Sequence, residues 1–178
     1  LMGLSIRENL NFKDGFFQND DFHKKALIKM IRKYQPEIVL TNAPSDRHPD
    51  HGRASQLTID SCFLSGLEKI DTNQDVWRPK AIYHYIQFNN LIPDFVVDIS
   101  DYFDKKIEVI KQYKSQFYDP DSSEKDTVIS SKSFFESIEY KNMTKISIYF
   151  TEAKEKLLLI FEISPSRLSA VEPTLIIS

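Results

Sequence analysis

The sequence predicts an α/β domain with a mostly parallel sheet flanked by helices. Three observations lead to this class. Short apolar runs rich in β-branched and aromatic residues alternate with longer segments in which apolar residues recur at helical spacing. Residues 37–41 are apolar enough for a strand that is covered on both faces. With 178 residues, of which 41% are hydrophobic, the chain fits one domain and can bury a core.

The individual elements follow from period, turn residues and capping residues. Residues 5–20 have no sustained period, so a loop is expected there, with a turn at Asp14-Gly15. Pro49 suits the first turn of a helix, and the aspartate pair at 20–21 can cap another. The expected elements are, in chain order, a helix over 22–34, a strand over 37–41, a helix over 50–69, strands over 81–88 and 95–100, and helices over 102–117 and 131–140.

Composition and charge exclude several classes of function. The net charge is −3 and the basic residues form no dense run, which argues against a nucleic-acid surface. We find no secretory signal and no apolar run long enough to span a bilayer, so no membrane contact is expected. The single cysteine, Cys62, excludes an internal disulfide framework and is expected to be a buried core thiol. This usage suits a reducing compartment, and we expect a cytoplasmic protein.

The segment 41-TNAPSDRHPDHGRAS-55 contains the residues that are best suited to metal binding or catalysis. It follows the strand at 37–41 at its carboxyl end, the edge where open α/β sheets bind ligands. A catalytic zinc takes protein ligands of the His and carboxylate type, and a further group must stabilise the oxyanion. His48, Asp50 and His51 provide these residue types. A proline between the two histidines lets their rings point in different directions, and the helix start helps to keep His51 neutral.

The same segment also has simpler interpretations. It could be a polar loop that caps a helix through Ser45 or Asp46, which is compatible with a metal site. Arg47 could hold a substrate carboxylate bidentately or form a surface ion pair. His84, within an expected strand, is interpreted as a packed or hydrogen-bonded side chain, and His23 as a solvated one.

Several stretches resemble one enzyme family in order and spacing, from about residue 4 to 140. They are IRENLNFKDGFFQND, RKYQPEIVLTNAPSDRHPDHGRAS, CFLSGL, WRPKAIYHYIQ, PDFVVDIS and YKSQFYDPDSSEKDTVISSKSFFESIEY. These stretches resemble the bacillithiol biosynthesis deacetylases, which belong to the LmbE/PIG-L superfamily of zinc-dependent N-acetylglucosaminyl deacetylases. The resemblance implies a Rossmann-like fold, a Zn²⁺ cofactor, a homo-oligomer and a small-molecule sugar conjugate as substrate. The implied reaction hydrolyses the acetamide of N-acetylglucosaminyl malate.

The resemblance also implies a role for each residue of the motif. His51 matches the family's downstream zinc ligand. His48 matches the histidine that stabilises the tetrahedral oxyanion, and Asp50 the aspartate that orients or charge-balances it. Arg47 matches an arginine that meets the malate carboxylate.

Two features depart from the family pattern. The AHPDDE-type motif, which supplies the other two ligands and the general base, does not occur in these 178 residues. We therefore expect a fold that lacks the first βα unit, and a chain that is an incomplete fragment of the enzyme. The alternative is a catalytically inactive protein of the same fold that binds a sugar conjugate or is a relic.

The second departure is the end of the chain. We expect a deacetylase-type domain over residues 1–140 and a divergent tail over 141–178. The tail is interpreted either as out-of-frame translation or as a folded replacement, since ISIYF and KLLLIFEI could pair as strands.

Overall fold

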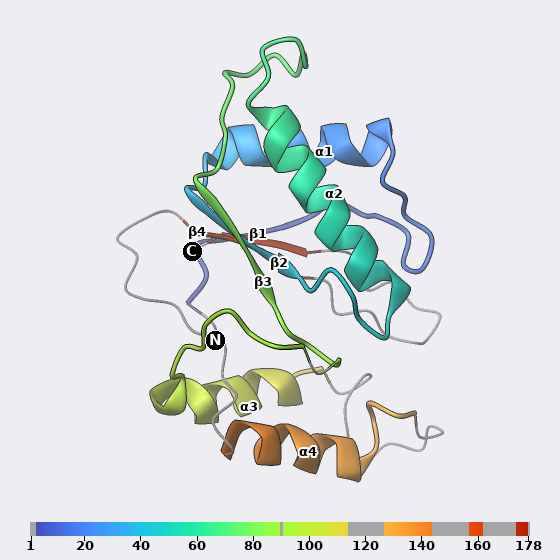
Figure 1. Ribbon diagram of the computed structural model, residues 1–178, viewed down its shortest axis with the longest axis vertical. Coiled ribbons are helices and arrows are strands. Elements are labelled where there is room, and N and C mark those ends of the chain that lie inside the picture. The colour runs from blue at the N-terminus through green and yellow to red at the C-terminus, as the bar shows by residue number, and fades with distance from the viewer. Residues whose placement is uncertain (1–2, 90, 114–126, 144–156, 162–173, 178) are drawn as a thin grey trace. The chain divides into compact units, whose positions relative to one another are not determined.

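The computed structural model describes residues 3–89, 91–113, 127–143, 157–161 and 174–177 (Figure 1). The chain divides into two compact units. The sheet unit contains β1 (Ile6–Asn9), α1 (Asp21–Tyr34), β2 (Ile38–Asn42), α2 (Pro49–Ser65), β3 (Ala81–Tyr85), β4 (Leu157–Phe161) and β5 (Thr174–Ile177). The helical unit contains the short 3-10 helix η1 (Ser100–Tyr102), α3 (Phe103–Lys111) and α4 (Lys132–Met143).

The sheet has the strand order β1-β5-β4-β2-β3. Strand β2 pairs in parallel with both β3 and β4, and Thr41 lies opposite His84 in the first of these pairs. Strand β5 runs antiparallel to β4 and to β1. The parallel strands β2 and β3 need a crossover connection, which α2 supplies. The predicted α/β class is thus confirmed, with an antiparallel β5–β1 pair added beside the parallel strands.

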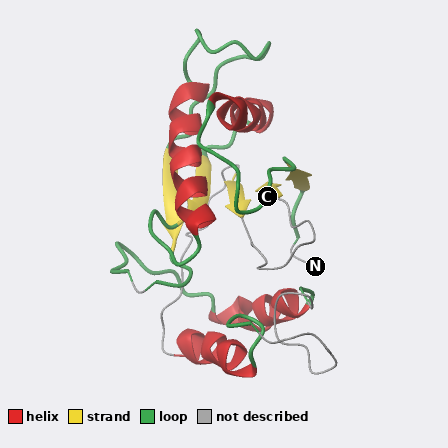
Figure 2. Ribbon diagram, turned by 90° about the vertical axis from the view of Figure 1, so that its right-hand side faces the viewer, coloured by secondary structure: helices red, strands yellow, loops and turns green. Residues whose placement is uncertain are grey.

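Helices α1 and α2 pack on one face of this sheet (Figure 2). Their shared core consists of apolar side chains that are almost fully buried: Phe12, Phe17, Leu27, Ile31, Val39, Ala54, Leu57 and Cys62. Burying such a side chain contributes about 1.5–3 kcal/mol. This core fixes α2 against β2, so the start of α2 is held near the carboxyl end of that strand.

Helix α1 starts and ends close to the predicted positions. Asp20 is its N-cap, and the carboxylate accepts a hydrogen bond of 3.0 Å from the main-chain N–H of His23. Gln35 ends the helix in the left-handed region with φ 50°, and its N–H donates to the carbonyl of Ile31 at 2.8 Å. Among the described residues, no helix is both long and apolar enough to cross a membrane.

A buried arginine of α1 donates hydrogen bonds to the C-terminal end of α2 and to the loop that follows it. Arg32 is 4% exposed, and its Nε donates to the carbonyl of Ser65 at 3.0 Å while Nη2 donates to that of Leu67 at 2.8 Å. Its Nη1 donates at 2.7 Å to both the carbonyl of Ile70 and the hydroxyl of Thr72. The guanidinium therefore gives a charged donor to the last carbonyl of α2 and to carbonyls of the loop that follows it.

Several sequence-based expectations differ from the structure. The strand expected over 81–88 ends at Tyr85, and the helix expected over 102–117 is α3, which ends at Lys111. Residues 6–9, expected in a loop, form β1 because β5 offers them an antiparallel partner. Residues 95–100, expected as a strand, are not a strand, and η1 begins at the end of that stretch. The expected helix over 50–69 already ends at Ser65. The tail segment KLLLIFEI does contain a strand, β4, whereas ISIYF lies outside the described residues.

We predict that replacing Arg32 by methionine destabilises the sheet unit by about 2–4 kcal/mol, because buried carbonyls lose a charged donor. The free energy of unfolding in urea measures this. Lys25→Met, an exposed basic position on the same helix, is the matched control and should change stability by less than about 0.5 kcal/mol. Equal values for the two variants would contradict a structural role for Arg32.

Candidate active site

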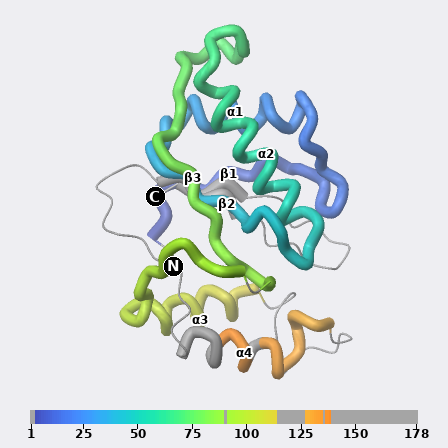
Figure 3. Tube along the Cα trace, in the orientation of Figure 1, coloured from blue at the N-terminus to red at the C-terminus, as the bar shows by residue number. Residues whose placement is uncertain are grey.

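The histidine motif lies between β2 and the first turn of α2 (Figure 3). His48 is the N-cap of α2, and its Nδ1 accepts a hydrogen bond of 3.3 Å from the main-chain N–H of Asp50. The cap expected at Ser45 or Asp46 is therefore wrong. A Cβ at Gly52 would lie only 3.1 Å from the carbonyl oxygen of Pro44, so the loop packs closely on the helix start.

Asp50 is fully buried although it is charged. Its Oδ2 accepts a hydrogen bond of 2.5 Å from the N–H of Gly15, which is 35 residues away in the sequence. Its Oδ1 pairs with Nη1 of Arg53, one turn further along α2. Because a buried carboxylate is unfavourable without such partners, these two contacts are what allow Asp50 to be buried here.

These contacts bring an additional acidic residue to the site. Candidate metal-ligand atoms of Asp14, His48 and Asp50 all lie within 4.8 Å of one another. Asp14 was predicted only as part of a turn, which the left-handed Gly15 with φ 74° confirms. No local pattern connects Asp14 with the histidine motif, so sequence reasoning did not include it in the site.

His51 occupies a different environment from His48, although their ring centroids are 5.3 Å apart. Nδ1 of His51 is buried and lies 3.2 Å from Oδ1 of Asp46, without the geometry of a good hydrogen bond. The Asp46 side chain is only 1% exposed, and its Oδ2 accepts a hydrogen bond of 3.0 Å from the N–H of Phe88. Asp46 thus connects the segment after β3 with the start of α2. This role differs from the capping role that was expected for it.

Burial and charge set the protonation of this pair. Burial lowers the pKa of His51 below its ordinary value, and the neighbouring Asp46 carboxylate opposes this only in part. Burial would raise the pKa of Asp46, but the N–H of Phe88 and the charge of His51 outweigh it and lower that pKa. At neutral pH the structure therefore holds an ionised Asp46 beside a neutral His51.

The neighbours of His48 and His51 favour different tautomers of the two rings. Since Nδ1 of His48 accepts the N–H of Asp50, neutral His48 carries its proton on Nε2 and can donate from that atom. The carboxylate of Asp46 favours a proton on Nδ1 of His51, which leaves Nε2 with a lone pair. A carboxylate behind one ring nitrogen is the usual support of a metal-binding histidine. These neighbours favour a lone pair on Nε2 of His51 and a proton on Nε2 of His48.

Arg47 is exposed beside these histidines. Its guanidinium carbon lies 5.0 Å from the centroid of the Phe88 ring, a cation–π contact. Its main-chain N–H donates to Oδ1 of Asp46 at 2.6 Å. The predicted role of Arg47 as a carboxylate-binding residue stays a prediction, but its position on Phe88 restricts where the guanidinium can reach.

The other residues noted in the sequence are packed or hydrogen-bonded. Nδ1 of His84 lies 2.8 Å from the carbonyl of Asn42 and 3.2 Å from the hydroxyl of Ser55, which confirms a hydrogen-bonded histidine. Cys62 is buried, as predicted, and burial raises the pKa of its thiol to about 12. The expectation of a solvated His23 is wrong.

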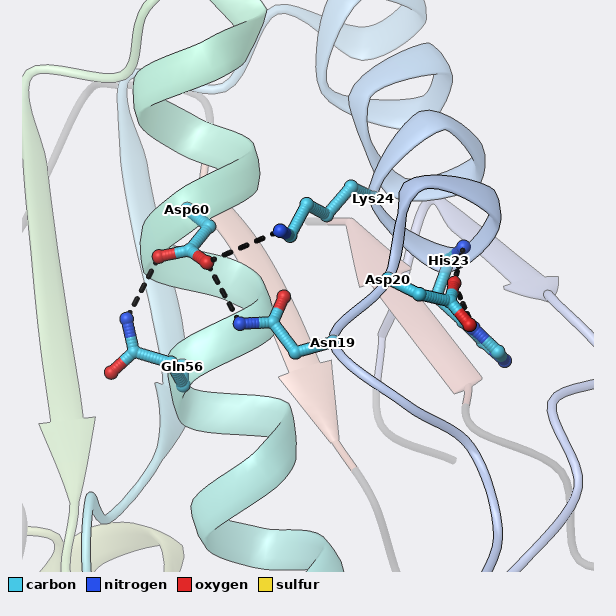
Figure 4. Close-up of polar contacts among 6 residues, drawn as sticks. All are labelled: Asn19, Asp20, His23, Lys24, Gln56 and Asp60. Carbon is cyan, nitrogen blue, oxygen red and sulfur yellow. Dashed lines mark hydrogen bonds and ion pairs between the residues drawn. The ribbon is translucent and has the colours of Figure 1, made fainter.

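The His23 side chain is only 14% exposed. Its ring centroid lies 4.5 Å from that of Phe12, and its Nδ1 lies 2.7 Å from the Asp20 carboxylate (Figure 4). The aromatic residues of the preceding loop therefore cover the ring, which a local reading of a helix start could not reveal.

Comparisons with known proteins found a family model, a curated relative and solved structures that are similar to this chain. The family model PIG-L, described as GlcNAc-PI de-N-acetylase, matches residues 1–62. Diacetylchitobiose deacetylase of Thermococcus kodakarensis is 28% identical over 122 residues, which are 66% of this chain and 46% of that protein. The crystal structure of a conserved protein from Thermus thermophilus superposes with a TM-score of 0.63 at 32% identity, over 65% of this chain and 52% of the other.

A further structural neighbour shows the fold alone. GalB, the 4-carboxy-2-hydroxymuconate hydratase of Pseudomonas putida, has a TM-score of 0.52 at 16% identity and covers 89% of this chain and 58% of the other.

The family model and the deacetylase relative show that part of this chain is similar to PIG-L-type deacetylases. Among the described residues, Asp14, His48 and Asp50 bring candidate ligand atoms close enough together to surround a metal ion. The chain spans about half the length of the deacetylase and of the Thermus protein that it matches.

The different neighbours of the two Nδ1 atoms, the N–H of Asp50 at His48 and the carboxylate of Asp46 at His51, predict different tautomers at pH 8. We expect ¹⁵N–¹H correlation spectra to show the proton of His48 on Nε2 and that of His51 on Nδ1. On acidification, His51 should protonate at a lower pH than an ordinary histidine with pKa 6.5, because burial lowers its pKa. The same tautomer for both rings, or a midpoint for His51 above the ordinary value, would contradict this arrangement.

Proposed function

We propose that this chain carries the downstream half of the active site of a zinc-dependent N-deacetylase that acts on N-acetylglucosaminyl malate in bacillithiol biosynthesis. The observation that carries the proposal is the pair of differently held histidines at the start of α2. Their environments suit a metal ligand at His51 and an oxyanion donor at His48. The similarity to a diacetylchitobiose deacetylase supports an acetamide of an amino sugar as the bond that is cleaved.

His51 is the residue of this chain that would hold the metal. Its Nε2 keeps a lone pair because Asp46 stands behind Nδ1, and its lowered pKa keeps the ring neutral for coordination. When bound, zinc lowers the pKa of a water molecule and polarises the carbonyl that is attacked. The remaining ligands and the general base would come from an AHPDDE-type segment outside these residues, as the resemblance implies.

Asp14 and Asp50 are the other possible ligands, but Asp50 is poorly suited to this task. Both of its oxygens already have protein partners, the N–H of Gly15 and the guanidinium of Arg53. A divalent cation beside Arg53 would also be repelled by the positive charge of that side chain.

His48 would act on the substrate itself. With its proton on Nε2, it can donate a hydrogen bond to the oxyanion that forms when the acetamide carbonyl is attacked. The N–H of Asp50 holds the ring in that tautomer, so the donor is in place before the reaction begins. Preorganised donors of this kind typically contribute a factor of about 10²–10³ to kcat.

Arg47 would determine the preference for a carboxylate-bearing conjugate. It stacks on Phe88 and presents a planar guanidinium, which suits bidentate binding of the malate carboxylate. We further propose that the protein is a cytoplasmic homo-oligomer that acts on this small molecule and binds neither nucleic acid nor membrane.

Replacing the two histidines should separate metal binding from turnover. In the protein that joins this chain to its AHPDDE-type segment, we expect His51→Ala to lose bound zinc. We expect His48→Ala to keep zinc and to lose a factor of about 10²–10³ in kcat. Metal analysis and acetate release measure these effects, and His23→Gln is the control for loss of a histidine outside the site.

Zinc retained by His51→Ala would overturn the ligand assignment. Tight binding of N-acetylglucosaminyl malate by the unaltered protein without acetate release would instead favour the alternative, a catalytically inactive sugar-conjugate-binding protein.

The role of Arg47 can be tested with two substrates. Arg47→Ala should raise KM for N-acetylglucosaminyl malate by about 10–100-fold, because a charged hydrogen bond contributes about 1.5–3 kcal/mol. KM for methyl N-acetylglucosaminide, which has no carboxylate, should stay within about twofold of the unaltered value, a difference below ~0.5 kcal/mol. An equal rise in KM for both substrates would show that Arg47 does not bind the substrate carboxylate.

A further inference from the structure

Gly15 is held through both of its main-chain polar groups by two residues of α2. Its N–H donates to Oδ2 of Asp50 at 2.5 Å, and its carbonyl accepts from Nη1 of Arg53 at 2.9 Å. The same Nη1 pairs with Oδ1 of Asp50. A single nitrogen of Arg53 therefore connects the buried carboxylate with the loop that precedes α1.

A second contact docks the same loop further along α2. Nδ2 of Asn19 donates to Oδ2 of Asp60 at 2.7 Å, and Nε2 of Gln56 donates to the other oxygen at 2.8 Å (Figure 4). The segment between Gly15 and Asn19 is thus attached to α2 at both ends. This leaves little freedom for the residue that directly precedes Gly15.

That residue is Asp14, whose candidate ligand atom lies within 4.8 Å of those of His48 and Asp50. A left-handed turn at Gly15, with φ 74°, directs the chain so that Asp14 meets the start of α2. The carboxylate of Asp50 is committed to Gly15 and Arg53, so it acts on the loop rather than on a ligand.

We infer that Arg53 is a positioning residue that, through Asp50 and Gly15, holds the carboxylate of Asp14 beside His48. The inference deepens the proposed function and rests on it for the role of His48. Nothing in the local sequence of Arg53 indicates this role, because it requires the loop and the helix to be in contact. Arg53 acts through Asp50 and Gly15 and has no proposed contact with the reacting atoms; its effect is to hold the Asp14 carboxylate next to His48.

The test uses the 178-residue chain without metal or substrate and compares Arg53→Gln with Arg53→Lys. Arg53→Gln should increase hydrogen exchange of the Gly15 amide by about tenfold or more, a factor that corresponds to ~1.4 kcal/mol. It should also shift the ring resonances of His48. Arg53→Lys should restore part of the protection, because one ammonium nitrogen can reach both acceptors as Nη1 does.

A double-mutant cycle with Asp14→Asn decides whether Arg53 acts through Asp14. In the Asp14→Asn background, Arg53→Gln should no longer shift the His48 resonances. Arg78→Gln is the matched control, since Arg78 also donates to a main-chain carbonyl, that of Phe63 at 3.0 Å, without a contact to the Gly15 loop. It should leave Gly15 exchange and the His48 resonances unchanged.

Unchanged Gly15 exchange in Arg53→Gln would overturn the inference, as would a His48 shift that persists in full in the Asp14→Asn background. If Arg53→Gln does not fold, as circular dichroism would show, Arg53→Lys carries the same comparisons with smaller expected changes. None of these readouts depends on turnover. An absence of deacetylase activity would therefore not contradict the positioning role of Arg53, and a failure of that role would not contradict the proposed activity.

Discussion

The arrangement of the site depends on one buried charge, the carboxylate of Asp50 in the first turn of α2. Fully buried, it is tolerable only with strong donors on both oxygens, and these come from the main chain of Gly15 and from Arg53. Satisfying the carboxylate therefore requires the loop before α1 to lie on α2. The same contact between loop and helix brings Asp14 to the histidine motif. The need to neutralise the buried carboxylate of Asp50 therefore decides that Asp14 is part of the site.

The helix start also determines what each histidine can do. Its first main-chain N–H groups have no intrahelical partner, and the one of Asp50 is satisfied by Nδ1 of His48. One turn into the helix, His51 instead faces the ionised Asp46, which is itself fixed by the N–H of Phe88. We therefore expect two identical side chains three residues apart to adopt different tautomers. This difference is what separates metal binding from oxyanion stabilisation in the proposed mechanism.

Local sequence rules predicted some elements well and failed at others for identifiable reasons. The N-cap of α1 and the turn at Gly15 depend on residues close in sequence; the turn was predicted, and the cap was predicted at Asp20 or Asp21 and lies at Asp20. Strand β1 was missed because its pairing partner, β5, lies at the other end of the chain. Residues 95–100 have the composition of a strand, yet they are not one, since β-propensity expresses packing against neighbours more than an intrinsic preference.

By itself, the sequence determined the α/β class, the place of the histidine motif at the carboxyl end of a buried strand, and the residue types that metal-assisted amide hydrolysis needs. These conclusions rest on periodicity and on side-chain chemistry, both of which are local. Only the tertiary structure decided that Asp14 and Arg53 belong beside the motif, that Asp46 supports His51, and that His48 itself caps α2. Each of these depends on contacts between segments, or on hydrogen-bond directions, that a linear pattern does not encode.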